Sequence, residues 1–385
     1  MQALQTPSKD TFSAVTPAIS QLKFAIQRDL VPIAQDIDVK GEYPRDFMHQ
    51  VGSIGGFGQA VPTNFGGMNE GIKGAIQVIE EISKECVSTG FITWCQIACT
   101  WYLQNTENEY LLQNLLPKVA TGQVIAGTGL SNPMKHFAGI EKIALVAEPC
   151  ADGYILNGLL PWVSNLGDGH YFAVAAKIKD TDEYLMAIAV NNCPGLSLKA
   201  HAHFIALEGS GTYSCCFKDV FVPHEFILAA PCEDYIARIK PGFILTQVGM
   251  GLGLVDSCVE LMKRVNQRTG HVNCFLDDGV EEIETDLLVA RQKTYTLADE
   301  VEAAQGRVNY SLLKDVIQAR IVASELSLRA SQAAMLHGGA KAYLLHNSIE
   351  KKLRESYFIA IVTPALKHLK KMLSEMNQVS VLNSH

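Results

Sequence analysis

The spacing of apolar residues divides the chain into three blocks. Up to about residue 122, apolar positions recur at helical spacing, and turns rich in proline and glycine, such as 61–67, separate the segments. Between about 123 and 232 the pattern changes to short apolar runs divided by Asp-Gly and Cys-Pro-Gly turns, which predicts strands. From about 233 the helical spacing returns.

The third block carries three long and narrow apolar stripes. Apolar or small residues step by four and three positions along 244–262, 283–304 and 312–333. A fourth helix is expected at 347–362 and ends near Pro364, because proline has no backbone donor; residues 365–376 can resume it. Long helices with such stripes predict a four-helix bundle.

Three glycines on the first of these helices need a separate explanation. Gly249, Gly251 and Gly253 alternate with other residues, but no strand precedes them and the third glycine comes too early for a dinucleotide fingerprint. They predict close packing of helices.

The block order predicts an α+β chain that is mostly α. We expect an N-terminal helical domain at 1–122, a middle β domain at 123–232 of antiparallel barrel or sandwich type, and a C-terminal helical bundle domain at 233–385.

The composition limits the classes of partner that the protein is expected to bind. The 385 residues are 48% hydrophobic and carry a net charge of -8, which argues against non-specific nucleic-acid binding. No run approaches the roughly 18 apolar residues of a membrane helix, and the start has no apolar signal core, so we expect a cytoplasmic protein without a membrane partner. The ten cysteines lack zinc-site spacing, which predicts free thiols and no metal.

Local motifs add a resemblance. Gly-flanked Val61-Pro62 precedes Gly66-Gly67, the run 152–158 (Asp-Gly-Tyr-Ile-Leu-Asn-Gly) precedes 162–165 (Trp-Val-Ser-Asn), and 336–343 holds a Gly-Gly pair. These motifs and the block order resemble the acyl-CoA dehydrogenase family over nearly the whole chain. The resemblance implies that fold and a flavin cofactor, FAD, with FMN still open.

The resemblance also implies roles for individual residues. Trp162 would cover one face of the flavin ring, Ser164 and Ser131 would meet its polar edge, and Arg268 (or its rival Arg264) would reach a neighbouring subunit's cofactor. Without the family pattern, Trp162 would be a core aromatic, Ser131 a turn cap and Arg268 a surface charge. The implied cofactor-binding residues are Leu130, Ser131, Trp162, Val163, Ser164, Arg268, His337, Gly338 and Gly339. A shared site predicts a homodimer or homotetramer.

The catalytic base of the family is missing. The family keeps a glutamate nine residues after an arginine that matches Arg354, and counting forward reaches Thr363. Other members of the family carry the base early on the first bundle helix, and that position falls near Phe243 here. Phe137 stands where the family has a serine that contacts CoA. A threonine hydroxyl is no useful base near neutral pH without an activating partner. The catalytic residues therefore stay unknown; the weak candidates are Asp256, Glu350, Glu355 and His337.

Three functions remain open. The first is a flavin-dependent oxidoreductase acting on the CH–CH group of an acyl thioester, of CoA or acyl carrier protein, that passes electrons to a flavoprotein. The second is a two-component flavin monooxygenase served by a flavin reductase, which needs no such base because the cofactor carries the chemistry. The third is a non-catalytic flavin-binding member of the fold.

Overall fold

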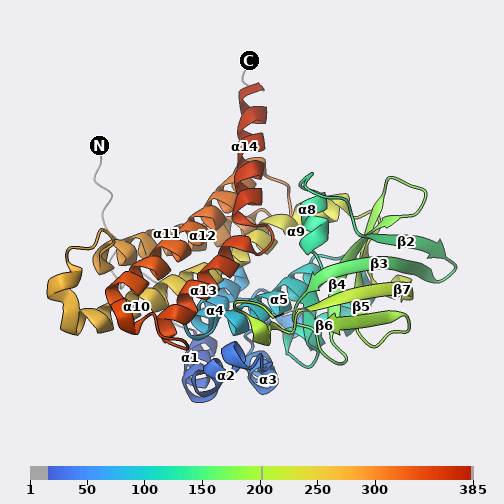
Figure 1. Ribbon diagram of the computed structural model, residues 1–385. Helices are drawn as coiled ribbons and strands as arrows, with labels where there is room; N and C mark the ends of the chain where they lie inside the picture. The colour runs from blue at the N-terminus through green and yellow to red at the C-terminus, as the bar shows by residue number, and fades with distance from the viewer. Residues whose placement is uncertain (1–15, 201–202, 383–385) are drawn as a thin grey trace.

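The computed structural model describes residues 16–200 and 203–382. Helices come first, a sheet follows, and helices close the chain (Figure 1). This order confirms the predicted fold class.

Helix α5 packs against α4 and α7 and is buried along almost its whole length. Thr16 caps α1 by accepting from the Ile19 amide, and Asn108 caps α6 in the same way. The helices are α1 (Pro17–Ala25), α2 (Ala34–Val39), α3 (Arg45–Ser53), α4 (Gly71–Glu85), α5 (Val87–Gln104), α6 (Glu109–Asn114) and α7 (Leu116–Ala120).

The described residues of the middle region form one sheet, in the order β6-β7-β3-β2-β4-β5-β8, with β1 added beside β4. The strands are β1 (Ala126–Thr128), β2 (Leu145–Cys150), β3 (Gly153–Val163), β4 (Tyr171–Ile178), β5 (Tyr184–Val190), β6 (Leu196–Ala200), β7 (Tyr213–Pro223) and β8 (Ile227–Ala229). Helix α8 (Ser131–His136) follows β1. The sheet is mixed where we expected antiparallel pairs, because β1 and β2 both run parallel to β4.

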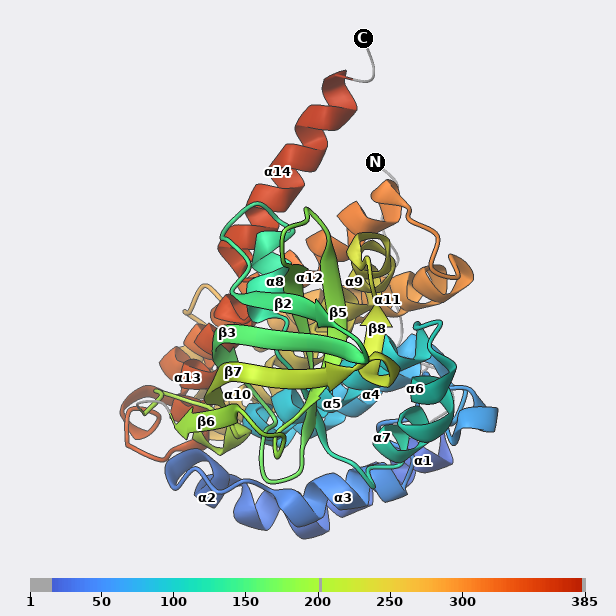
Figure 2. The ribbon, with the colours of Figure 1, turned by 90° about the vertical axis from the view of Figure 1, so that its right-hand side faces the viewer.

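Strand β4 shows how the sheet joins two cores. Phe172 and Val174 point into a core within the sheet region, whereas Ala173 and Ala175 between them pack into the core of the helices. Alternate residues of a strand point to opposite faces, so β4 is apolar on both faces from Phe172 to Ala176. Figure 2 views the sheet from one side, with helices behind it.

The last region is a helical bundle from which α14 projects (Figures 1 and 2). Its helices are α9 (Glu233–Thr246), α10 (Val248–Asn273), α11 (Val280–Ala303), α12 (Tyr310–Gly338), α13 (Ser348–Ile361) and α14 (Leu366–Leu382). The predicted stripes are largely buried. A Cβ on Gly253 would lie 2.2 Å from the Glu80 carbonyl oxygen, which confirms close packing, here against α4.

One segment passes a test of length and composition for a membrane span. Helices α9 and α10 together cover Glu233–Asn273, 41 residues, with a most apolar window of mean hydropathy 1.4. Because 89% of that window is buried inside the fold, burial in the protein core accounts for its apolar character.

Candidate functional site

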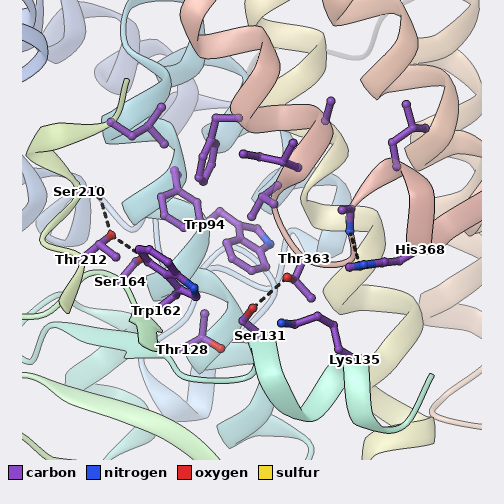
Figure 3. A pocket seen from close by; sticks show the side chains of 18 of the residues that line it. Trp94, Thr128, Ser131, Lys135, Trp162, Ser164, Ser210, Thr212, Thr363 and His368 are labelled. Carbon is purple, nitrogen blue, oxygen red and sulfur yellow. Dashed lines mark hydrogen bonds between the residues drawn. The ribbon is translucent and has the colours of Figure 1, made fainter. Parts of the chain in front are cut away.

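A cavity of about 860 Å³ lies where the three regions meet. Helix α5 provides Phe91 and Trp94, α9 provides Phe243 and α13 provides Phe358. The sheet side provides Trp162 and other residues near the end of β3, and the connection from α13 to α14 closes the remaining side (Figure 3). A cavity of this size matches ordinary small-molecule and cofactor sites.

The floor of the pocket is aromatic. The rings of Phe91 and Phe358 meet edge to face, with centroids 4.6 Å apart, and those of Trp94 and Phe243 do so at 5.2 Å. The indole N–H of Trp94 donates to the Thr246 hydroxyl at 3.1 Å, so its buried polar atom is satisfied. The floor is therefore rigid and apolar.

The sheet side carries hydroxyl groups. Ser164 follows β3, and its backbone bridges to Thr128 of β1. The Ser164 hydroxyl is 2.7 Å from that of Thr212, and the Thr128 hydroxyl is 3.0 Å from that of Tyr102. The side-chain amide of Asn165 holds this corner by donating to the Ala126 carbonyl at 2.8 Å.

Trp162 stands beside these hydroxyls (Figure 3). It is 48% exposed and its ring lies 5.8 Å from that of Phe204 at a tilt of 54°. A large aromatic side chain left half exposed in a cavity is a suitable face for a flat ligand.

Thr363 lines the pocket opposite this wall. Its hydroxyl is 2.9 Å from the Ser131 hydroxyl, although 232 positions separate the two residues (Figure 3). Phe243 lines the same pocket. Both places where the family pattern would put a carboxylate thus face one cavity, and neither holds one.

A buried arginine supports the Thr363 segment from behind. Arg320 donates to the Gln247 side-chain carbonyl at 3.1 Å, and the Gln247 amide donates to the Thr363 carbonyl at 2.9 Å. Arg320 also donates to the Ile359 carbonyl at 2.6 Å, and no carboxylate pairs with it within residues 16–200 and 203–382. Burial lowers the pKa of Arg320 to about 10. The guanidinium fixes the end of α13 and the backbone at residue 363.

The pocket lining is basic. No Asp or Glu contributes to it in the part of the chain that the structure describes, whereas Lys135, Lys367, His368 and Lys370 do. Burial, followed by the charges of Lys367 and Lys135, lowers the pKa of His368. The Ala365 amide donates to His368 Nδ1 at 3.4 Å, so the neutral ring carries its proton on Nε2 and acts there as a donor.

The acids named from the sequence are engaged elsewhere. Burial alone would raise the pKa of Asp256, but Lys84 and Arg291, 3.0 and 2.8 Å away, outweigh it and hold the pKa low. Glu350 pairs with Arg354. Glu355 is fully buried and accepts from the Val87 amide and from Lys352, both at 3.0 Å. None of the three acids lines the pocket.

His337 also lies away from the pocket. Its ring nitrogens bond the Asn266 side-chain oxygen at 2.9 Å and the Asp278 carbonyl at 3.0 Å, and the ring is buried. Both ring nitrogens are thus occupied within the chain. A catalytic role for His337 stays a prediction.

The implied cofactor residues fall into two groups. Ser131, Trp162 and Ser164 line the pocket, with Leu130 and Val163 buried behind them. The second group gathers where α10 and α12 end: Arg268 is exposed on α10, and His337, Gly338 and Gly339 close α12. The second group does not line this chain's pocket, so its part in a shared site stays a prediction.

The residues present fit a flavin ring. Such a ring needs a flat apolar face and hydrogen-bonding groups along its polar edge. Trp162 offers the face, and the hydroxyls of Ser131, Ser164 and Thr128 converge on the same cavity. Sequence reasoning missed Thr128, Lys135 and His368, which become visible only once folding brings them into one pocket.

Comparisons with known proteins agree with the fold. Residues 21–123 match the family model "Acyl-CoA dehydrogenase, N-terminal domain". A probable acyl-CoA dehydrogenase, YngJ, of Bacillus subtilis is 25% identical over 87% of this chain and 90% of its own. A glutaryl-CoA dehydrogenase of Desulfococcus multivorans is 25% identical over 92% of this chain and 94% of its own.

Solved structures show the same architecture. A glutaryl-coenzyme A dehydrogenase in complex with glutaryl-CoA has a TM-score of 0.83 at 21% identity, covering 97% of this chain and 96% of its own. KijD3 in complex with FMN and a dTDP-sugar has a TM-score of 0.80 at 16% identity, covering 97% of this chain and 96% of its own. Dibenzothiophene monooxygenase from Paenibacillus sp. A11-2 has a TM-score of 0.80 at 15% identity, covering 92% of this chain and 95% of its own. The chain therefore has the acyl-CoA dehydrogenase fold, and its residues 21–123 match the N-terminal domain of that family.

Proposed function

We propose that this chain is a flavin-dependent oxidoreductase that uses reduced flavin and oxygen, in the manner of a two-component monooxygenase. The observation that carries the proposal is the lack of any Asp or Glu side chain in the described lining of the pocket. Removing an α-proton from an acyl thioester needs a positioned base, and losing one costs about 10²–10⁴-fold in rate. An oxygen-dependent flavin reaction does not need this base.

The flavin supplies the redox chemistry when bound, and the chain's own residues bind and orient the reactants. Trp162 packs against the ring. Where Thr363 donates to Ser131, the Ser131 hydroxyl keeps its own proton for the ligand. His368 presents Nε2–H to an oxygen atom in the pocket, and the aromatic floor excludes water.

Dehydrogenation of an acyl thioester is the second candidate, and the relatives named acyl-CoA dehydrogenases favour it. It requires a base other than a carboxylate. Among the residues described as lining the pocket, the histidine is His368. Its Nε2 could accept a proton only if its Nδ1 carried the ring proton, and the contact between Nδ1 and the Ala365 amide would then be lost. The substrate would be a CoA or acyl carrier protein thioester, with an electron-accepting flavoprotein as partner.

We further propose a homodimer or homotetramer in the cytoplasm, with FAD as cofactor and FMN as the alternative. Exposed apolar side chains near the ends of α10 and α12 support the oligomer, since contiguous apolar surface marks interfaces. They are Val272, Phe275, Leu336, Tyr343, Leu344 and Leu345. The ten free cysteines support a reducing compartment.

One experiment separates the two reactions. The purified protein is titrated with FAD and with FMN, and its visible flavin spectrum is recorded. It is then mixed anaerobically with a panel of acyl-CoAs, and separately loaded with reduced flavin and exposed to oxygen. No bleaching by any acyl-CoA, together with a distinct oxygenated spectrum, is the expected result. Bleaching would establish the second candidate, and a protein that takes up no flavin would remove both.

A further inference from the structure

A positive charge lies beside the position of the missing base. Ser131 and Lys135 lie four residues apart on α8 and therefore share a face of the helix, and both line the pocket. In Figure 3 the ammonium end of Lys135 is directed toward the pair of Ser131 and Thr363. Where the family pattern would put a carboxylate, this chain has two neutral hydroxyls and a nearby lysine.

The lysine is only partly neutralised. Its ammonium is 2.8 Å from a Glu141 carboxylate oxygen, but that carboxylate is 37% exposed and does not line the pocket. Lys135 itself is 19% exposed, so water screens the pair only in part and the pair contributes modestly. Lys370 is paired in a similar way with Glu325, whereas the exposed Lys367 has no carboxylate within 4.0 Å in the described chain.

The surroundings strengthen the positive character. His368 lines the cavity, and its neutral ring carries the proton on Nε2. Helix α14 begins at Leu366, which also lines the cavity, so the positive end of its helix dipole lies there too. The aromatic floor lines the same cavity. The pocket therefore offers both basic side chains and an apolar aromatic surface.

We propose that the substrate of this pocket is an amphipathic anion. Its charged group, a carboxylate or a group of similar chemistry, binds beside Lys135, Ser131 and Thr363, and its apolar body lies on Phe91, Trp94 and Phe243. The ligand, and not the protein, brings the negative charge to this corner. The proposal rests on the pocket being the substrate site of the proposed function.

The test uses two probes that share one ring system. These are 1-anilinonaphthalene-8-sulfonate, an anion, and N-phenyl-1-naphthylamine, which lacks the sulfonate. Their dissociation constants are measured by fluorescence on the full-length protein, with and without saturating flavin. The first variant is Lys135→Gln. The second is Lys367→Gln, because Lys367 is exposed and its replacement should leave the fold intact. Lys177→Gln is the matched control, since Lys177 forms a similar surface pair with Asp182 on the sheet.

We expect the flavin-saturated wild type to bind the sulfonate probe at least about tenfold more tightly than the neutral one, as one charge-assisted hydrogen bond allows. Lys135→Gln should remove most of this preference and leave the neutral probe within about twofold, and high salt should weaken only the sulfonate probe. Equal affinity of the wild type for both probes would overturn the proposal, as would a Lys135→Gln variant that weakens both alike.

The outcome is independent of the flavin chemistry. A protein that refuses flavin but keeps the anion preference refutes the proposed function and not this inference. A protein that takes up flavin but shows no preference refutes this inference and leaves the proposed function standing.

Discussion

Replacing Trp162 by alanine tests the placement of the flavin. The side chain is 48% exposed toward the pocket, and a tryptophan presents at most about 250 Å². A ring stacked on it would thus cover about 100 Å², which at about 25 cal/mol per Å² contributes about 2.5 kcal/mol. Trp162→Ala should therefore weaken flavin binding roughly 60-fold, because 1.4 kcal/mol corresponds to about a factor of ten.

The assay is a titration of the flavin-free protein with FAD, followed by flavin fluorescence and by calorimetry. Trp162→Phe keeps an aromatic face and should lose about tenfold or less. Phe221→Ala is the control, because Phe221 is a 45% exposed aromatic residue on β7 that does not line the pocket. Wild-type affinity in Trp162→Ala would refute the stacking role, and an equal loss in Phe221→Ala would show that the effect is not specific.

Three further predictions concern the base, the acid stability and the assembly. Thr363→Glu places a carboxylate beside Ser131, so in a flavin-loaded protein that binds an acyl-CoA it should speed anaerobic bleaching by about 10²–10⁴-fold; unchanged bleaching would contradict the assignment of position 363. Burial lowers the pKa of His170, whose Nδ1–H donates to the Asn165 carbonyl at 3.0 Å. As the pH falls, His170 of the unfolded chain binds a proton before His170 of the folded chain does. The contribution of His170 to stability is therefore full above about pH 6.5 and declines as the pH falls toward its lower pKa in the folded chain. The melting temperature of His170→Gln should accordingly fall less between pH 7 and pH 5 than that of the wild type, and parallel losses would count against the mechanism. Phe275 is 86% exposed, and Phe275→Glu should shift the oligomer toward monomer in light scattering; an unchanged mass would place the interface elsewhere.

The helices were predictable because their apolar spacing is long and regular. The stripe from Ile244 to Met262 is buried as expected, and α13 ends before Pro364 with α14 resuming beyond it. The short strands β1, β6 and β8 were not predicted, since three to five residues carry too little periodicity. The parallel pairing of β1 and β2 with β4 depends on tertiary contacts, which local spacing does not encode.

The site was only partly predictable for the same reason. Motifs placed Trp162, Ser164 and Ser131, and counting from Arg354 placed Thr363. The hydrogen bond between Ser131 and Thr363 joins residues 232 positions apart, so no local pattern announces it. The basic corner made by Lys135 and His368 was missed, because each is an ordinary residue in its own segment and gains meaning only where α8 meets α14.

A crystal structure of the protein with flavin and a bound anionic ligand tests the central claim most directly. The account predicts the flavin ring against Trp162 and near the hydroxyls of Ser131 and Ser164. It also predicts the anion near Lys135 and no Asp or Glu oxygen, from this chain or a neighbouring copy, at the reacting part of the ligand. A ring bound outside this pocket, or a carboxylate reaching into it from a second subunit, would contradict the account.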